Sequence, residues 1–546
     1  MKKTMKYFSM AALALVGAVM TSCSNSSDFE ETLTQPQPAS GDKVETLTAS
    51  VSMAGGETRA LTDDGVKTFA VRDKIAVVYK NTSGETVKAE SEELEAGDIT
   101  NEGKSANFTV TLTNADKTQN VTYIYPAAMA NSDGTINYNA LAEQDGTLAT
   151  LASDLDYCEY SGAWSGSNLP TGDMSNQLVV CAYTLKNSDG SDDITSNVTT
   201  MTVSDGTNVY IVNRTAAAGP IYVAIQPTDN KNIKYTAIAS SKVYTKNVTG
   251  KTYTNGKWYP LGLRMTQNDD IIPHLFSVNG KKIYFSKGNL RAECASADND
   301  GSTQETWTWR FSTNQYDRIG GLKSGESGTK SGNNNINGNG SINPAGNVDL
   351  FGWSTSATHL GINVTNSNNT AYLGAFADWG SASEVTACIG TGWRTPTSNE
   401  WRYLTVTRSG NRFAMAKLWN NRCGMILLPD DWNTGYYSLN NINDASVDFS
   451  VNTISSDDWT NKLARGAVFL PVTGQRNGSN WINGANDQLH YWSSTKGDTD
   501  SGTSANANHM RWMPNTTTPE ANRGLAPDTG AGRCNGYAVR LVYDIK

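Results

Sequence analysis

The residue whose position most directly predicts chemistry is Cys23. It follows a lysine-rich start and an apolar segment at 7–20, with small residues directly before it. These features describe a signal peptide at 1–23, and the apolar run is too short to span a bilayer. A cysteine at the cleavage point is the residue that bacterial lipoproteins acylate after export, although Met20 stands where leucine is usual. We therefore expect a lipid on Cys23; the alternative is an ordinary signal peptide with an incidental cysteine.

Two polar loops near the C-terminus carry side chains that could bind a sugar without a metal ion. Tryptophan stacks on the apolar face of a sugar, while amide, carboxylate and guanidinium groups satisfy its hydroxyls. Residues 475–487 and 508–512 offer this mixture. The ligand contacts we expect are Arg476, Asn480, Trp481, Asn486, Asp487, Arg511 and Trp512. For Trp481 and Trp512 the alternative is that each anchors its loop.

The remaining reactive residues form no catalytic or metal-binding pattern in the sequence. The histidines are scattered, and no cysteine has CxxC or Cys/His spacing. We expect no enzymatic activity, no cofactor and no metal; calcium is unsupported, with only Asp430 and Asp431 in its favour. The six cysteines other than Cys23 permit disulfides in an oxidising compartment, including Cys158–Cys181. Buried thiols are the alternative.

The elements that position these residues should be mainly β-strands. The chain has 546 residues, too many for one ordinary domain, and only 18% are charged. Frequent glycine and strand-forming apolar runs indicate a secreted, all-β protein. The net charge of −9 is spread along the chain without a basic stripe, which excludes nucleic acid as the expected partner.

Several strands and one helix can be placed from local patterns. Leu47, Ala49, Val51 and Met53 alternate with polar residues, which predicts a half-buried strand. Further strands are expected at 69–79, 106–112, 121–125, 178–183, 209–212 and 221–226, and a hairpin over Asn279-Gly280. A helix should begin near Thr397, with Ser398 as its cap and Trp401 on its apolar side. Residues 24–43 have the composition of a linker.

The first half of the chain carries the acylation signature at Cys23, called a lipobox, followed in order by Thr58-Arg59-Ala60, Asp73-Lys74-Ile75-Ala76-Val77, Gly250-Lys251-Thr252-Tyr253 and Lys257-Trp258-Tyr259. Over about residues 40–265 this series resembles the fimbrillin family, the lipoprotein-derived pilins of anaerobic Gram-negative bacteria. It implies two transthyretin-like β-sandwich lobes, at 44–155 and 156–265. It also implies that an Arg-specific protease cuts after Arg59, so that the first strand leaves with the lipid and a strand from another pilin subunit fills the groove. The alternative is that Arg59 is an exposed turn residue in a permanently anchored lipoprotein.

The second half of the chain carries a series of short motifs: Phe285–Leu290, Asp349–Trp353, Gly392–Thr397 with Glu400-Trp401, Leu428–Trp432, Tyr491–Thr495 and Tyr537–Arg540. Over residues 274–546 this series resembles the paralogous surface domain of fibre-degrading and gut bacteria, which is related to the C-type-lectin-like fold. The resemblance implies an α+β domain, a small twisted antiparallel sheet with one or two helices and a long loop region. Trp393, Trp401 and Trp492 should lie in the core, and Arg394 and Arg540 should pair with buried partners.

The sequence thus predicts a cell-surface adhesin, the tip subunit of a fimbrillin-type pilus that binds glycan or host matrix through its C-terminal domain. An acidic cluster at 28–31 resembles the signal that exports lipoproteins to the outer face of the outer membrane, so the precursor should be an outer-membrane lipoprotein at the cell surface. One alternative is a permanently anchored glycan-binding lipoprotein of a polysaccharide-uptake system. The other is a non-binding pilus spacer or anchor.

Overall fold

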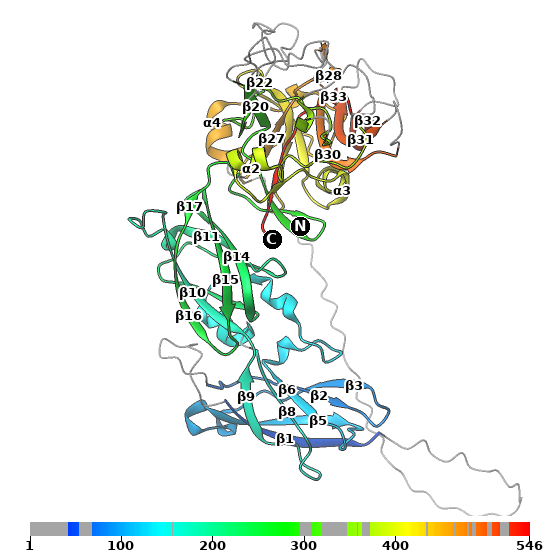
Figure 1. Cartoon of the computed structure of the whole chain (residues 1–546). Helices are drawn as coiled ribbons and strands as arrows, with labels where there is room; N and C mark the ends of the chain where they lie inside the picture. The colour runs from blue at the N-terminus through cyan, green and yellow to red at the C-terminus, as the bar shows by residue number, and fades with distance from the viewer. Residues whose placement is uncertain are drawn as a thin grey trace, which may run out of the picture.

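Three β-rich units follow one another along an elongated molecule (Figure 1). The structure is a computed structural model, and it describes residues 42–53, 68–155, 157–294, 307–318, 347–356, 359–362, 372–432, 435–463, 466–477, 480–482, 488–498, 505–513 and 524–546. Cys23, Arg59, Asn486 and Asp487 lie outside these ranges. The prediction of a mainly β protein is confirmed.

The first unit is a single eight-stranded sheet that folds over its own apolar core. Its strand order is β3 (Thr86–Glu90), β2 (Ala76–Lys80), β6 (Val121–Tyr125), β8 (Cys158–Gly162), β9 (Gly172–Asn176), β1 (Val44–Met53), β5 (Ser105–Thr113) and β4 (Ile99–Thr100). The layer containing β2 and β6 lies over β1 and β5 (Figure 1). Val77, Tyr123 and Phe108, which come from both layers, are fully buried between them.

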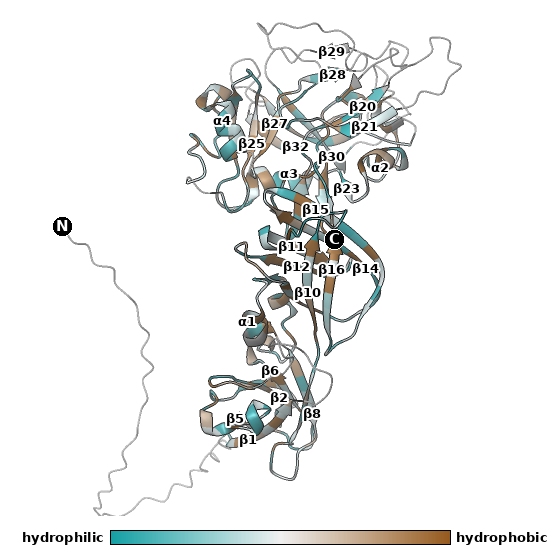
Figure 2. Cartoon of the chain, turned by 90° about the vertical axis from the view of Figure 1, so that its left-hand side faces the viewer, coloured by the Kyte–Doolittle hydropathy of each residue, from teal (hydrophilic) through white to brown (hydrophobic). Residues whose placement is uncertain are grey.

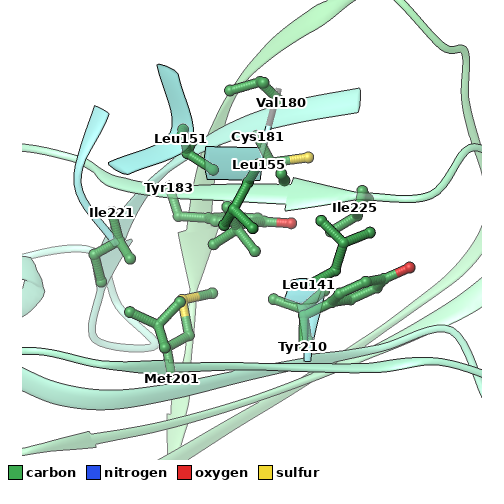
Figure 3. Packing of buried hydrophobic residues seen from close by; sticks show 14 of the residues in the cluster. Leu141, Leu151, Leu155, Val180, Cys181, Tyr183, Met201, Tyr210, Ile221 and Ile225 are labelled. Carbon is green, nitrogen blue, oxygen red and sulfur yellow. The ribbon is translucent and has the colours of Figure 1, made fainter. Parts of the chain in front are cut away.

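The second unit packs two sheets face to face. One sheet has the order β13 (Ile221–Ile225), β10 (Val179–Lys186) and β16 (Trp258–Arg264); the other has β17 (Thr266–Gln267), β15 (Lys242–Tyr253), β14 (Thr228–Ala239), β11 (Val198–Ser204), β12 (Val209–Asn213) and β7 (Glu143–Gln144). Figure 3 shows the core between them, where Tyr183 and its neighbour Ile221 from the first sheet lie over Met201 of the second. Figure 2 shows brown, hydrophobic segments along the strands of this middle unit.

The chain passes between the first two units more than once. Strand β7 and the side chains of Leu141, Leu151 and Leu155 belong to the second core, whereas β8 and β9 follow them in sequence and belong to the first sheet. Segments on both sides of residue 155 therefore contribute to both units.

The described residues of the third unit form five small sheets. Two of these sheets have four strands, in the orders β18 (Phe276–Val278), β19 (Lys281–Phe285), β34 (Val542–Asp544), β23 (Trp393–Arg394) and β26 (Thr453–Ile454), β24 (Phe413–Leu418), β25 (Cys423–Leu427), β27 (Val468–Pro471). Two have three strands, in the orders β21 (Trp307–Phe311), β20 (Leu290–Cys294), β22 (Asn347–Val348) and β29 (Asn480–Ile482), β28 (Gln475–Asn477), β33 (Asn535–Gly536). The last sheet also has three strands, in the order β30 (Leu489–Lys496), β31 (Asn506–Met513), β32 (Gly524–Gly532). Helix α2 (Ser383–Ile389), α3 (Ser398–Arg402) and α4 (Ser456–Asp458) accompany them. Trp393, Trp401 and Trp492 are buried, as predicted.

Most local predictions in the first two units are confirmed, and two details of the chain are corrected. Helix α3 is capped by Thr397 and not by Ser398: the Thr397 hydroxyl accepts from the Glu400 amide, and the Glu400 carboxylate accepts from the Thr397 amide. This reciprocal capping box satisfies two donors, which a cap at the next residue would not. The suggested Cys158–Cys181 disulfide is wrong, because Cys181 is a free thiol and the Cys158 thiol donates to Asn176 instead.

The second and third units share an apolar junction. Ile211, Ile238 and Val243 from the second unit belong to the same buried cluster as Tyr284 and Tyr543 of the third. At its edge, the Lys234 ammonium lies 3.9 Å from the centre of the Tyr543 ring and donates to the Asp544 carbonyl. These contacts fix the two units against each other.

Candidate functional site

Strand β1 is an interior strand of the first sheet, bonded on both sides. It runs antiparallel to β5 from Val44 opposite Thr113 to Ser52 opposite Ser105. On its other side its last residues run parallel to β9, from Val51 opposite Gly172 to Met53 opposite Met174. The strand therefore closes a ladder that would otherwise be open between β5 and β9 (Figure 1).

Alternate side chains of β1 enter the core of the first unit. Ala49 and Val51 are 0% and 3% exposed, and Leu47 and Met53 pack against the same cluster. This confirms the alternation expected from the sequence. On the outer face, the hydroxyls of Thr46 and Thr111 lie 3.0 Å apart, so polar contacts also tie the strand to β5. Backbone bonds hold β1 in register, and its small apolar side chains fill a groove.

The exposed start of β1 is held by charge. Lys117 donates to Glu45 at 2.9 Å, and Lys43 lies 3.3 Å from the same carboxylate. The hydrogen bond from Lys117 lowers the pKa of Glu45. Because these groups are solvated, the pairs contribute little stability and mainly set where the strand begins.

Loss of β1 would leave a specific binding groove. The facing edges of β5 and β9 would present unpaired amide and carbonyl groups, and the apolar sites of Ala49 and Val51 would open between them. Such a groove favours another strand of the same alternating pattern, since main-chain hydrogen bonds give affinity and the side-chain sites give register.

The strand nearest the end of the chain, β34, is held differently. It lies inside its sheet, paired with β19 on one side and β23 on the other. Val542 and Tyr543 are buried, and Arg394 donates to the Asp544 carboxylate at 2.7 Å. In this conformation β34 has no free edge to offer another sheet.

The structure separates the predicted ligand residues of the third unit. Arg476 and Trp512 are 0% and 1% exposed, and the Trp512 indole donates to the Ala445 carbonyl at 2.8 Å. Their side chains offer no surface to a sugar, so for these two the expected ligand contact is wrong: both pack into the core. Arg511 is partly buried, and burial lowers its pKa. Asn480 and Trp481 lie in β29, opposite β28, and their contact with a ligand stays a prediction.

Arg394 and Arg540 are structural, as predicted. Arg394 donates to both oxygens of Glu400, at 2.7 and 2.6 Å. Burial opposes ionisation of Glu400, but these two bonds outweigh it and lower its pKa. Arg540 is fully buried, where its guanidinium donates to the side-chain oxygens of Asn289 and Gln315 at 3.3 Å, and burial lowers its pKa to about 10.

The structure also brings together two histidines that the sequence left scattered. The pairing of β30 with β31 sets His490 and His509 5.3 Å apart, and both rings stack on Tyr537. Burial lowers the pKa of His509 to about 3 and that of His490 well below its usual value. In the sequence, the one sign of this stack is that both histidines stand in segments of alternating strand pattern. Because their pKa values are lowered, both imidazole rings are neutral at ordinary pH.

Within the part of the chain that the structure describes, no group of three or more His, Cys, Asp or Glu side chains is arranged to hold a metal ion. No helix among these residues is long and apolar enough to cross a membrane.

Comparison with solved structures returns fimbrial and cell-adhesion proteins. A fimbrial assembly protein from Parabacteroides distasonis aligns with 44% of this chain and 95% of its own at 8% identity, with a TM-score of 0.26. A provisionally assigned cell adhesion protein from Bacteroides fragilis aligns with 48% and 94% at 13% identity, with a TM-score of 0.25. The tip fimbrial protein Mfa3 from Porphyromonas gingivalis, truncated at its C-terminus, aligns with 39% and 80% at 13% identity, with a TM-score of 0.17.

The sequence matches no family model and no curated protein.

Proposed function

We propose that this chain is a cell-surface adhesin of the pilus type, which accepts a strand from another subunit in the place of β1. The observation that carries the proposal is the position of β1: it is interior, bonded to β5 and β9, and connected to the rest of the chain by the segment that contains Arg59. A cut after Arg59 leaves β1 attached by non-covalent contacts alone. An alternating strand from another subunit can then replace it.

The place proposed for the chain is the tip of the pilus. A tip subunit accepts a strand but need not donate one, and β34 is bonded on both sides within the third unit. The third unit is then the outermost part, and glycan or host matrix is its proposed ligand. Before the cut, a lipid on Cys23 anchors the precursor in the outer membrane.

The first test is the mature N-terminus of native surface material, determined by mass spectrometry. A chain that begins at Ala60 supports assembly after cleavage. A chain that begins at acylated Cys23 contradicts it and favours the permanently anchored lipoprotein. The measurement separates the two because only cleavage releases β1.

The second test measures strand replacement directly. A chain that begins at Ala60 is mixed with a labelled peptide of residues 44–53, and binding is followed by fluorescence polarisation. We expect tight binding, and at least about tenfold weaker binding of the same peptide carrying Val51→Asp, because a carboxylate would enter the apolar core. A matched control is Ser50→Asp, on the opposite face of the strand. Equal binding of all three peptides, or none by a folded chain, would refute the groove.

A further inference from the structure

A cleft of about 750 Å³ lies where the second and third units meet. Its volume is within the range of sites that enclose small organic ligands. Its walls come from β11, β12 and the β14–β15 turn on one side, and from residues 273–282, 429–432, Tyr436, Lys462 and Gly466 on the other. None of these residues belongs to the two polar loops in which the sequence predicted ligand contacts.

The wall from the second unit carries polar, uncharged groups beside the apolar side chains of Ile211, Ala216 and Ile238. It presents the amides of Asn197 and Asn213 and the hydroxyls of Thr199, Ser240 and Ser241, all on exposed residues. Hydroxyl and amide groups can each donate and accept, which suits a ligand with many hydroxyls. Asn213 lines the cleft, and its side-chain oxygen accepts a long hydrogen bond of 3.4 Å from the Thr200 hydroxyl.

The turn that carries the two serines has an unusual backbone. Ser240 and Ser241 have φ values of 49° and 60°, the left-handed region in which Asn and Gly are favoured. Elsewhere in the chain, the hairpin at Asn279-Gly280 uses the favoured pair, with φ values of 49° and 76°. Serine at both positions costs stability that an Asn-Gly turn would avoid. This cost is explained if the two hydroxyls serve a ligand.

The facing wall supplies an aromatic surface. Tyr436 is 50% exposed, and its ring centre lies 5.9 Å from that of Trp432, which is buried behind it. A half-exposed ring backed by a buried one is a rigid platform for the apolar face of a sugar.

The charges that line the cleft are paired with one another or with neighbours. Asp430 accepts from Arg408 at 2.7 Å, and Asp431 lies 3.0 Å from His274. Lys462 lies 2.7 Å from Asp458, and Lys282 lies 3.9 Å from Glu143. A charged ligand would have to compete with these pairs, whereas an uncharged one would not.

From this arrangement we infer that the cleft binds an uncharged oligosaccharide, which stacks on Tyr436 and hydrogen-bonds to Asn197, Asn213, Ser240 and Ser241. The apolar junction around Ile211 and Ile238 holds the two walls in place, so little ordering accompanies binding. The inference rests on the proposed adhesive function and names the site and chemical class of its ligand.

The test uses the full chain on an array of neutral, sialylated and sulfated oligosaccharides, followed by titration calorimetry with the strongest neutral binder. We expect neutral glycans to bind. Tyr436→Ala should weaken binding at least about tenfold, and Tyr436→Phe should retain it, because the stacking ring is kept. Tyr138→Ala is the matched control: Tyr138 is also an exposed tyrosine, 42% exposed, but lies outside the cleft. It should leave affinity unchanged.

A second variant keeps the inference falsifiable if Tyr436→Ala disturbs folding. The double variant Ser240→Asn with Ser241→Gly should raise the midpoint of thermal unfolding and lower the affinity for the glycan several-fold. Damage to the fold cannot produce this combination, because it would lower the midpoint as well. Binding only of sialylated or sulfated glycans, neutral binding unaffected by these variants, or no binding at all would overturn the cleft site. Pilus assembly is tested separately, by the mature N-terminus and by strand replacement, so its failure can be distinguished from failure of the cleft site.

Discussion

The stacked histidines of the third unit predict how its stability depends on pH. Burial holds the pKa of His509 at about 3 and that of His490 well below 6.5, and the nearby Arg511 guanidinium acts in the same direction on both. Below pH 6.5 the unfolded chain therefore binds a proton at each ring that the folded chain does not. Stability is fully present above the unfolded pKa and is lost as pH falls towards the folded pKa.

The size of the effect follows from the pKa difference. Each histidine removes about 1.4 kcal/mol of unfolding free energy per pH unit once pH is well below 6.5. His509 alone should thus contribute a loss of about 2.7 kcal/mol at about pH 4.5, two units below its unfolded pKa, and the pair up to about twice that. Carboxylates do not account for a loss in this window, because their ordinary pKa values of 3.8 to 4.5 lie at or below its lower end. Burial raises the pKa of Asp378, and its protonation in the folded chain would act in the opposite direction.

The assay is urea unfolding followed by tryptophan fluorescence between about pH 7 and about pH 4.5. All tryptophans except Trp164 and Trp258 follow residue 300, so the signal reports mainly on the third unit. His509→Phe keeps a ring to stack on Tyr537 but cannot titrate. It should halve the slope of unfolding free energy against pH, from about 2.7 to about 1.4 kcal/mol per unit. A slope that is unchanged in this variant, or wild-type stability that is flat over the window, would refute the reasoning.

Three further variants test the assignments of individual residues. Arg394→Ala should lower the free energy of unfolding by about 3 kcal/mol, because it leaves the Glu400 carboxylate, 7% exposed, without its bidentate partner. Measured by urea unfolding, Arg394→Lys should recover part of this loss. Trp512→Ala removes a core side chain and should lower the free energy of unfolding by about 3–5 kcal/mol, whereas Trp419→Ala, at a residue 38% exposed, should lower it far less. Equal shifts of the thermal unfolding midpoint in the two variants would contradict the core role of Trp512. Val51→Asp in the uncut chain should destabilise the first unit by several kcal/mol, since Val51 is 3% exposed, and hydrogen exchange at β5 should rise with it.

Where a signal is local, the sequence was sufficient. The alternation from Leu47 to Met53 predicted both the strand and the face it buries, because successive residues of a strand point to opposite sides. The turn at Asn279-Gly280 followed from the backbone angles these residues tolerate. The cap of α3 was misplaced by one residue, since Thr397 and Ser398 are both capping types and only the reciprocal bond with Glu400 distinguishes them.

The burial of polar-looking residues could not be read from the sequence. Trp512 and Arg476 stand among polar neighbours, yet both are buried, because strand pairing turned alternate residues of those segments inward. Local composition describes a segment, whereas burial depends on what other segments lie over it. The same reason explains why His490 and His509 became a stacked pair.

The sequence by itself determined that this protein is mainly β, where many of its strands run, and that Trp393, Trp401 and Trp492 lie in its core. Tertiary structure alone decided that β1 is bonded on both sides, that β34 has no free edge, and that Asn213 faces Tyr436 across a cleft. The physical reason is that the alternation of side chains along a strand and the backbone angles of a turn depend on near neighbours in the chain. A groove or a cleft is formed by segments far apart in the sequence, which only tertiary packing brings together.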